Sequence, residues 1–392
     1  MKFITLEGAI EKDGSALVKE ILELILSDKE YLNHLSHLFD IEISSHYSKL
    51  LKLFINHIKN KDYPISSYTP KRLSIAIEKY KKNKIKRHLL EELLARFYYD
   101  LCIFGENISL DYPPLLQIEI ASRCNYKCVF CYQSDKSFSD PKSPFMGYMD
   151  IQLFKCLIDE IEGNIPYITF ASRGEPTLHP KFLEILEYCK GKFKDIKINT
   201  NASTLNKYKI EKLLDICDTI VFSIDSPDPE IYPQIRVNGN LNRVLKNIKL
   251  FNSIRSTHPR DKEVITRASG VLYNKKIQSE HLYQELFSPL FDQTAFVEYD
   301  PWEKMYSLPI NEIKSPCSQP FYRFFIWFDG SYNCCDMDYK STLSEGCTKI
   351  SKEYSLKDAW NSEVMNKIRT LHHSGKRNEL EPCRRCPLSA ES

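Results

Sequence analysis

The sequence lacks any apolar run long enough to cross a membrane, and its N-terminus lacks the unbroken apolar core of a secretory signal peptide. A membrane span needs about 20 apolar residues in succession, and no stretch of the 392 residues approaches that length. Glu7, Glu11 and Asp13 interrupt the N-terminal segment. We therefore expect a cytoplasmic protein.

The sequence also lacks a charge excess of either sign. Its formal net charge is +2, so it has no general attraction for nucleic acid or acidic membrane surfaces. The one basic run, at 79–88, is flanked by Glu78, Glu91 and Glu92, which favours a solvated helix surface. No internal repeat is present. The length and the 42% apolar content fit one large α/β domain with smaller additions.

Cysteine, in contrast, is abundant, with 13 in the chain. Because there is no export signal, thiols clustered at short spacing indicate metal binding rather than disulfides. Three of them, Cys124, Cys128 and Cys131, lie within the segment CNYKCVFCY. Four stand alone in apolar patterns and are predicted to be small buried hydrophobic side chains: Cys102, Cys156, Cys189 and Cys217.

Apolar periodicity divides the chain into three regions. Residues 1–110 are predicted to be helical, with helices at 15–26, 46–59 and 88–104 and no winged-helix pattern. Over 111–305, strands alternate with helices at 150–162, 183–190, 207–217 and 241–254. The strands are expected at 115–121, 167–171, 196–200, 219–225, 264–273 and 294–300. This alternation predicts a parallel sheet that closes into a partial or full barrel. The cysteine triplet follows the first strand, where the loops of such barrels carry chemistry.

The last region, 306–392, has a different pattern. Residues 321–335 are predicted to form a hairpin that turns at Asp329–Gly330. Residues 355–375 are predicted to form a capped helix, and Cys383-x-x-Cys386 lies near the end of the sequence.

Three clustered cysteines are one too few for a [4Fe–4S] cluster, which usually takes four thiolates. A missing ligand leaves one iron open, as catalytic metal sites leave a position for substrate. A structural zinc site is the alternative, but it needs a fourth Cys or His, and none lies near in the sequence.

The triplet resembles the signature of the radical S-adenosylmethionine (SAM) superfamily, with Phe130 before its last cysteine. The resemblance covers roughly residues 115–390 and implies a partial (β/α)6 TIM-like radical SAM barrel. It also implies an open iron that binds SAM, and reductive cleavage of SAM to a 5′-deoxyadenosyl radical that removes hydrogen from a substrate. By this resemblance Phe130 lies against the adenine.

Further motifs follow the next strands in order. The segment SRGEP (172–176) resembles the family's GGEP turn, which holds the SAM amino group, although Arg173 replaces its first glycine. The segment NTNAS (199–203) resembles a polar strand end that faces the ribose. Residues 222–236 resemble a segment that places a serine on the ribose and an arginine on the SAM carboxylate. The SAM-binding residues implied by these motifs are Gly174, Glu175, Asn199, Ser223 and Arg236.

The C-terminal cysteines resemble the auxiliary-cluster extension called SPASM, or its shorter relative, twitch. The spacing Cys317-x12-Gly330-x4-Cys335, completed by Cys383 and Cys386, implies one four-thiolate auxiliary cluster. Later SPASM cysteines are absent from the sequence, which favours the twitch-like arrangement. Cys334 and Cys347 are spare, and either could replace one of these ligands. A zinc ribbon on the same four cysteines is the alternative.

Three functions remain open. The first is oxidation of a sugar or cyclitol-type alcohol, with the auxiliary cluster as electron acceptor. The second is maturation of a ribosomally made peptide or protein, and the third is a non-enzymatic iron–sulfur or zinc scaffold. Either enzyme needs an electron donor such as flavodoxin or ferredoxin. Acids or bases that act on the substrate are suggested by position only, at Arg267, Glu298, Asp300, Asp336 and Asp338.

Overall fold

The computed structural model describes residues 2–4, 11–13, 110–165, 167–193, 195–259 and 264–387. The three helices predicted within residues 15–104 lie outside this part of the chain, as does Cys102. Residues 2–13 contain an antiparallel pair of strands, β1 (Lys2–Ile4) and β2 (Glu11–Asp13). The apolar patterns of the N-terminal region did not predict this hairpin.

One sheet of eight strands forms the centre of the molecule, in the order β10-β9-β7-β6-β5-β3-β11-β12. Its strands are β3 (Leu115–Ile118), β5 (Tyr167–Phe170), β6 (Asp195–Thr200), β7 (Thr219–Ser223), β9 (Ile265–Leu272), β10 (Gln293–Glu298), β11 (Arg323–Ile326) and β12 (Tyr332–Asn333). The six predicted strands are present and all pair in parallel. The predicted hairpin is β11–β12, with Gly330 in its turn at a φ of +81° that suits glycine. Its first strand also pairs in parallel with β3 and so extends the barrel sheet, which the sequence did not predict.

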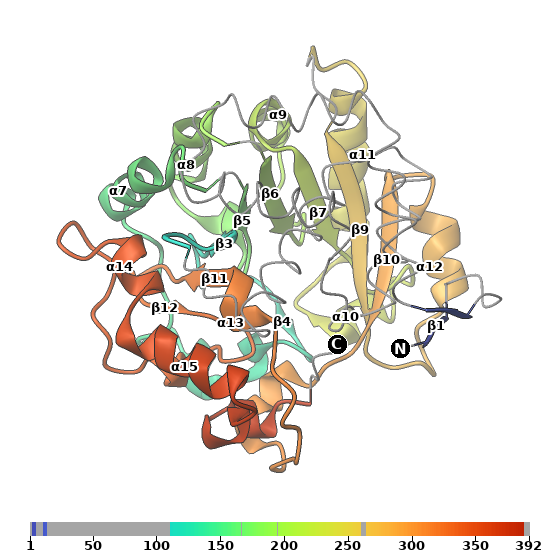
Figure 1. Ribbon diagram of the computed structural model, residues 1–392. Coiled ribbons are helices and arrows are strands. Elements are labelled where there is room, and N and C mark those ends of the chain that lie inside the picture. Colours follow the sequence, from blue (N-terminus) through green and yellow to red (C-terminus); the bar gives the residue numbers. More distant parts are fainter. Residues whose placement is uncertain are drawn as a thin grey trace.

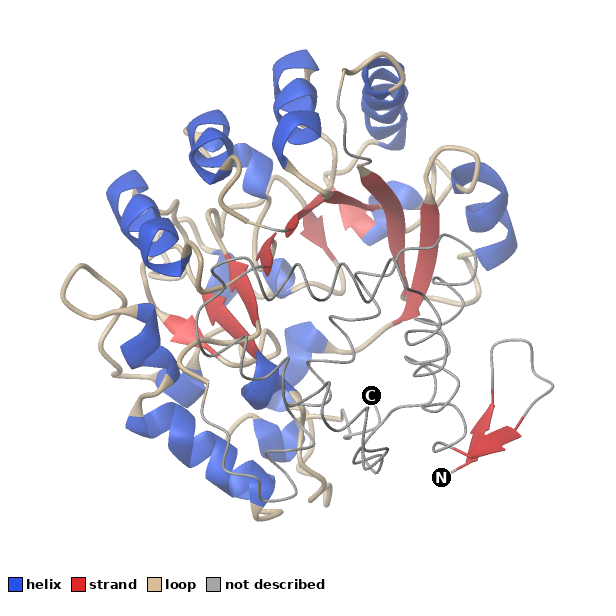
Figure 2. Cartoon of the chain, turned by 45° about the horizontal axis from the view of Figure 1, so that its top comes forward, coloured by secondary structure: helices blue, strands red, loops and turns tan. Residues whose placement is uncertain are grey.

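Helices cover the outer face of the curved sheet, and together they form a partial TIM-like barrel (Figures 1 and 2). The covering helices are α7 (Ile151–Ile161), α8 (Phe182–Cys189), α9 (Lys207–Ile216), α11 (Leu241–Arg255) and α12 (Glu280–Phe287). Each follows one strand and precedes the next, as the alternation predicted. Asp150 caps α7 by accepting hydrogen bonds from two backbone N–H groups of its first turn, which explains where this helix begins.

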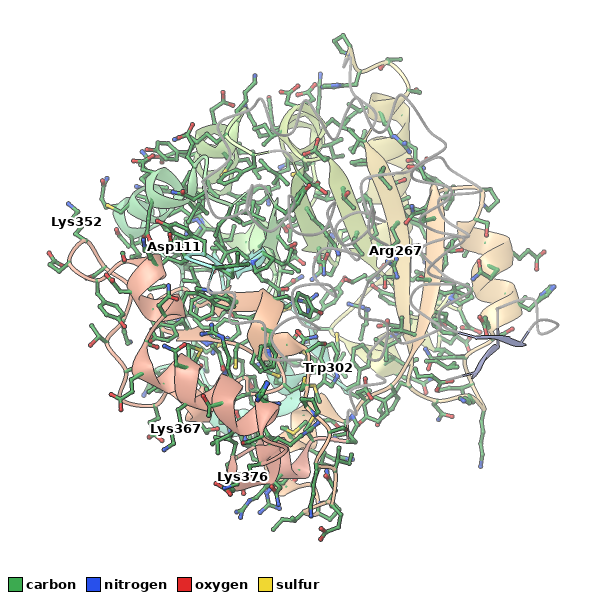
Figure 3. All side chains as sticks on the ribbon, viewed as in Figure 1. Asp111, Arg267, Trp302, Lys352, Lys367 and Lys376 are labelled. Atoms are coloured by element: carbon green, nitrogen blue, oxygen red, sulfur yellow. The ribbon has the colours of Figure 1, made fainter. Side chains whose placement is uncertain are left out.

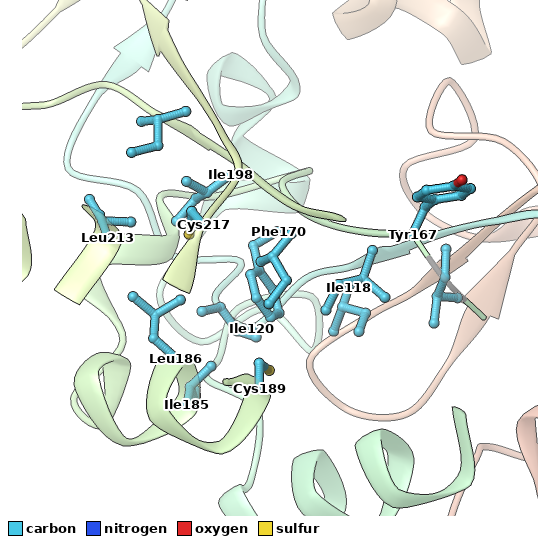
Figure 4. Packing of buried hydrophobic residues seen from close by; sticks show 14 of the residues in the cluster. Ile118, Ile120, Tyr167, Phe170, Ile185, Leu186, Cys189, Ile198, Leu213 and Cys217 are labelled. Atoms are coloured by element: carbon cyan, nitrogen blue, oxygen red, sulfur yellow. The ribbon is translucent and has the colours of Figure 1, made fainter. Parts of the chain in front are cut away.

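The main core lies between the strands and these helices (Figure 4). Ile118, Phe170 and Ile198, from three successive strands, and Ile185 and Leu213, from two helices, are fully buried. Cys189 and Cys217 lie in this core as predicted, whereas Cys156 is only half-buried. Because all strands of the sheet except β12 run in the same direction, the loops after these strands meet at one edge of the sheet.

Short elements surround that edge. They are β4 (Lys127–Cys128), paired antiparallel with β8 (Arg236–Val237), and the helices α6 (Lys136–Ser139), α10 (Tyr232–Ile235) and α13 (Gln319–Tyr322). The single helix predicted over 355–375 is wrong: the segment forms α14 (Leu356–Trp360) and α15 (Glu363–His373). The break occurs because Ser362 caps α15, accepting a hydrogen bond from the backbone N–H of Met365.

In the described part of the chain, no helix combines the length and the apolar character needed to cross a membrane.

Candidate functional site

The first cysteine group lies on the loop that follows β3. Cys131 caps the 3-10 helix η1 (Tyr132–Ser134), and its sulfur lies 3.5 Å from the backbone nitrogen of Gln133. The sulfur of Cys124 lies 3.4 Å from the backbone nitrogen of Tyr126. Cys128 is in β4, where its pairing with β8 sets it opposite Arg236. The loop therefore brings three thiols together at the carboxyl edge of the sheet.

Burial raises the pKa of all three thiols. The pKa of Cys124 rises to about 12 and that of Cys128 to about 11, and that of Cys131 lies well above its ordinary value. For Cys124 and Cys131 the next cause is the charge of the neighbouring Cys128, which reflects how closely the three lie. Such thiols bind metal as thiolates only where a cationic centre compensates their charge. The donor set therefore fits a sulfur-ligated metal centre.

An arginine ion pair lies beside this group. The Nη1 of Arg236 is 3.8 Å from the sulfur of Cys128, and its Nε is 2.5 Å from Oδ2 of the fully buried Asp225. Burial lowers the pKa of Arg236, but the Asp225 carboxylate outweighs this effect and holds the pKa well above its usual range. Asp225 also accepts a hydrogen bond from the backbone N–H of Val271. It thereby fixes Arg236, a role that the sequence analysis did not assign to it.

The turn of residues 172–176 packs directly against the start of the cysteine loop. The backbone N–H of Glu175 donates to the carbonyl of Arg123 at 3.0 Å. A Cβ on Gly174 would lie 2.3 Å from the carbonyl oxygen of Ala121, so only glycine allows this approach. Ser172 has a φ of +134°, a conformation that non-glycine residues adopt only where the surroundings impose it.

Glu175 connects this turn to the end of β6. Its carboxylate accepts hydrogen bonds from the Thr200 hydroxyl and the Asn201 backbone N–H, both at 2.7 Å, and from the hydroxyl of Thr177. Asn201 in turn donates to the side chain of Asn125 in the cysteine loop at 3.0 Å. The three predicted motifs thus meet in one hydrogen-bonded network, in which the Glu175 carboxylate is held by protein donors.

The remaining residues implied for SAM lie at the same edge. The register pairs Asn199 with Val221, two residues before Ser223, so Asn199 and Ser223 share the inner face of neighbouring strands. The Oδ1 of Asn199 is buried and has no hydrogen-bond partner among the described residues, which fits a polar ligand at this position. The ring of Phe130 lies 6.0 Å from the guanidinium carbon of Arg236.

A second group of cysteines gathers between β12, α15 and the last described residues. Burial raises the pKa of Cys335 and Cys383 well above the ordinary value, and the charges of Cys317, Cys334 and Cys386 raise both further. The four predicted auxiliary ligands therefore lie together, and Cys334 lies with them.

Two buried residues of the segment 372–377 hold the backbone around these cysteines. The Nδ1 of His372 accepts the backbone N–H of Cys317 at 3.0 Å. Burial, together with Arg377, lowers the pKa of His372 to about 3, so the ring is neutral. Arg377 donates to the carbonyls of Cys383 and Cys386 at 3.2 and 3.3 Å. The sequence analysis missed both, because nothing in the local pattern distinguishes them from a basic end of a surface helix.

A small aromatic cluster is in contact with both cysteine groups. Tyr132 stacks on Tyr339, with ring centroids 5.1 Å apart, and lies 6.5 Å from Trp302. The same cluster contains Met305 and Phe138. Cys131, of the first group, packs against this cluster. In the second group, Cys386 belongs to the cluster and Cys335 packs against it. The two cysteine groups therefore contact the same cluster of buried hydrophobic residues.

The candidate acids and bases differ in their surroundings. Arg267 is on β9 (Figure 3), and its Nε is buried without a hydrogen-bond partner in the described part of the chain. Glu298 is exposed and pairs with Lys275 at 2.9 Å. Burial raises the pKa of Asp300. It also raises the pKa of Asp336, which follows Cys335 in the sequence. The carboxylate of Asp338 accepts hydrogen bonds from four neighbouring residues and serves the local fold: Tyr306, Asn333, Thr342 and Leu343.

As they stand, no three His, Cys, Asp or Glu side chains of the described residues form a group that could hold a single metal ion. The cysteines of a [4Fe–4S] cube bind different iron atoms rather than one ion.

The fold and the two cysteine groups define a partial-barrel enzyme with an iron–sulfur extension. Residues 118–258 match the radical SAM superfamily, and residues 317–387 match the SPASM iron–sulfur cluster-binding domain. The chain belongs to the radical SAM superfamily and carries a SPASM domain, as its sequence motifs predicted. Its cofactors are accordingly a SAM-binding [4Fe–4S] cluster, SAM and auxiliary iron–sulfur centres.

The chain is 28% identical over 166 residues to the antilisterial bacteriocin subtilosin biosynthesis protein AlbA of Bacillus subtilis, covering 42% of this chain and 34% of AlbA. It is 26% identical over 160 residues to the mycofactocin maturase MftC of Mycolicibacterium smegmatis, covering 40% of this chain and 39% of MftC. The matches thus span less than half the length of these curated relatives. Among solved structures, Streptococcus suis SuiB bound to the precursor peptide SuiA has a similar fold. The TM-score is 0.54 at 16% identity, over 81% of this chain and 89% of SuiB.

Proposed function

We propose that this radical SAM enzyme oxidises its substrate by two electrons. The observation that carries the proposal is the aromatic cluster of Tyr132 and Tyr339, which contacts Cys131 of the first group and both Cys335 and Cys386 of the second. A centre that initiates a radical and a centre that accepts an electron must act on the same substrate. Two cysteine groups in contact with one aromatic cluster suit that task.

We assign the SAM-binding cluster to Cys124, Cys128 and Cys131. When bound, it supplies the electron that cleaves SAM to methionine and a 5′-deoxyadenosyl radical, which removes a hydrogen atom from the substrate. The side chains and backbone groups that we assign to SAM are those of Phe130, Gly174, Glu175, Asn199, Ser223 and Arg236.

The chain's own residues position SAM. Asp225 holds Arg236 beside Cys128, where a guanidinium can pair with the SAM carboxylate. Glu175 ties the turn of 172–176 to β6, so the backbone that faces the SAM amino group is held firmly. The Asn199 amide and the Ser223 hydroxyl face the ribose from neighbouring strands.

We assign one auxiliary [4Fe–4S] cluster to Cys317, Cys335, Cys383 and Cys386, with Cys334 as the alternative to Cys335. Four thiolates leave no iron open for SAM, so such a cluster serves as an electron carrier. His372 and Arg377 hold its ligands through the backbone. When bound, this cluster would supply an acceptor for the one electron that remains after an alcohol carbon has lost a hydrogen atom and its hydroxyl a proton, which would leave a ketone.

The first candidate substrate is therefore a sugar or cyclitol-type alcohol. The cysteine content of residues 317–387 supports it, because six cysteines suffice for one four-thiolate cluster but not for two. The second candidate is a ribosomally made peptide. It is supported by two of the relatives, a bacteriocin biosynthesis protein and a maturase, and by the precursor peptide bound to SuiB.

The proposal includes an external electron donor of the flavodoxin or ferredoxin type, because the SAM-binding cluster must be reduced before each cleavage.

We divide the chain into a barrel region, 111–305, and an auxiliary-cluster region, 306–392, that shares the barrel sheet through β11. The described cysteines are all free of disulfides, which fits a reducing cytoplasm.

Anaerobic assays with SAM and dithionite test the proposal. We expect the Cys128→Ala variant to form no 5′-deoxyadenosine, and the Cys383→Ala variant to form it while failing to oxidise substrate. The Cys156→Ala variant, which changes a half-buried cysteine of α7, is the matched control and retains both activities. Equal loss of cleavage in the Cys128 and Cys383 variants would contradict the electron-acceptor role of the second group.

A further inference from the structure

Arg173 replaces the first glycine of the family's GGEP turn, which residues 172–176 resemble. Its guanidinium is almost fully buried. Its Nε donates to Oε2 of Glu119 at 2.7 Å, and its Nη2 donates to Oε1 at 2.6 Å. The backbone N–H of Arg173 donates to the same carboxylate at 3.1 Å. Glu119, the residue that directly follows β3, thus holds both the side chain and the backbone of the turn.

The other side of the guanidinium faces the C-terminal region. Its Nη1 donates to the carbonyl of Tyr339 at 2.8 Å, and its carbon lies 4.0 Å from the ring centroid of Trp327. Trp327 begins the hairpin turn after β11, and Tyr339 lies four residues beyond Cys335. One side chain therefore joins the predicted SAM-binding turn to the segment that carries the second cysteine group.

Two further contacts tighten the junction. The backbone N–H of Phe328 lies 3.4 Å from Oε1 of Glu119. Gln133, just after the cysteine triplet, donates from its amide to the carbonyls of Ser122 and Arg173 at 2.7 and 2.6 Å. The backbone of the turn is thus clamped on both sides, which explains how Ser172 is kept at a φ of +134°.

We propose that Arg173 is a positioning residue that couples the C-terminal cysteine region to SAM binding. A glycine at this position would leave the turn independent of residues 327–339. With Arg173 and Glu119 in place, a displacement of the C-terminal region moves the turn, and SAM bound to the turn stabilises the docked C-terminal region. The inference rests on the proposed function, because it assumes that SAM occupies this turn.

A simple structural role predicts a different outcome, so the test must measure coupling rather than activity. Removing one partner of a buried ion pair leaves an uncompensated charge and threatens folding, whereas replacing both by neutral residues of similar volume is tolerated. The test variant is therefore Arg173→Met with Glu119→Gln. A second variant, Arg173→Lys, keeps the charge but loses the two-pronged contact.

Each variant, and the unaltered chain, is reconstituted with and without the additional change Cys383→Ala, and SAM affinity is measured by anaerobic equilibrium dialysis. Electron paramagnetic resonance of the reduced protein, with and without SAM, is the second readout. We expect the Met/Gln variant to keep its iron and to bind SAM about tenfold more weakly, which corresponds to about 1.4 kcal/mol. In the unaltered chain Cys383→Ala weakens SAM binding. In the Met/Gln variant it has no further effect, because the coupling is absent.

The proposal is overturned if SAM affinity changes by less than about twofold, or if Cys383→Ala weakens it by the same factor in both backgrounds. If the Met/Gln variant loses iron, the Arg173→Lys variant decides by the same criteria. Failure of the unaltered chain to bind SAM would instead refute the proposed function, and this inference with it.

Discussion

The buried pair of Asp225 and Arg236 makes a stability prediction that depends only on the geometry of the site. The two charged groups lie 2.5 Å apart, with 0% and 8% of their side chains exposed. The change Asp225→Asn preserves an oxygen that can accept the Val271 N–H but leaves the guanidinium without its counter-charge. Breaking a buried pair in this way costs about 3–5 kcal/mol. In a chain of 392 residues that corresponds to a melting temperature lower by about 4–6 °C.

The assay is urea denaturation and thermal melting of the anaerobically reconstituted protein. The double change Asp225→Asn with Arg236→Gln removes the remaining charge and is expected to recover part of the loss. A destabilisation below about 1 kcal/mol, the value for an exposed ion pair, would refute the reasoning. So would a double variant that is no more stable than Asp225→Asn alone.

Three further predictions follow from single residues. Gly174→Ala forces the turn away from the carbonyl of Ala121, so SAM binding measured by dialysis is expected to fall at least tenfold, or about 1.4 kcal/mol, while iron content is retained. Burial lowers the pKa of His179, whose ring is held between Met149 and Lys181, so the unfolded chain binds more protons than the folded one at acidic pH. Its contribution to stability is present above the unfolded pKa of about 6.5 and is lost as the pH falls below it; the change His179→Gln is expected to flatten that part of the stability profile measured by urea denaturation. Trp360→Phe removes the indole N–H that donates to the carbonyl of Leu110 at 3.0 Å, and is expected to lower the free energy of unfolding by about 1–3 kcal/mol in the same assay. A loss below about 0.5 kcal/mol would show that this buried hydrogen bond does not stabilise the fold.

Most of the barrel could be predicted from the sequence, because each strand is a short apolar run and each helix is amphipathic. Parallel pairing followed from their alternation, and the position of the cysteine triplet followed from the parallel direction of the strands. The sequence did not indicate that β11 joins β3, since a short apolar run does not specify which edge it pairs with. The break between α14 and α15 did have a signal, the Ser362–Glu363 step that begins a helix.

The site was only partly predictable for the same reason. Motifs identified the cysteines, the turn at 172–176 and Arg236, because their chemistry depends on local spacing. Glu119, His372 and Arg377 act through partners far away in the sequence, and such pairings exist only after folding. Glu119 nevertheless left a signal in the sequence, as the one charged residue of the segment from Leu115 to Ala121, which is apolar apart from Glu119 and Gln117.

The most direct test of the account is an iron and sulfide count on the anaerobically reconstituted chain, followed by addition of SAM and dithionite. We expect about eight irons per chain, in two [4Fe–4S] clusters, together with formation of 5′-deoxyadenosine. About four irons with cleavage would remove the proposed electron acceptor. No iron and no 5′-deoxyadenosine would contradict the central claim that Cys124, Cys128 and Cys131 hold the cluster that cleaves SAM.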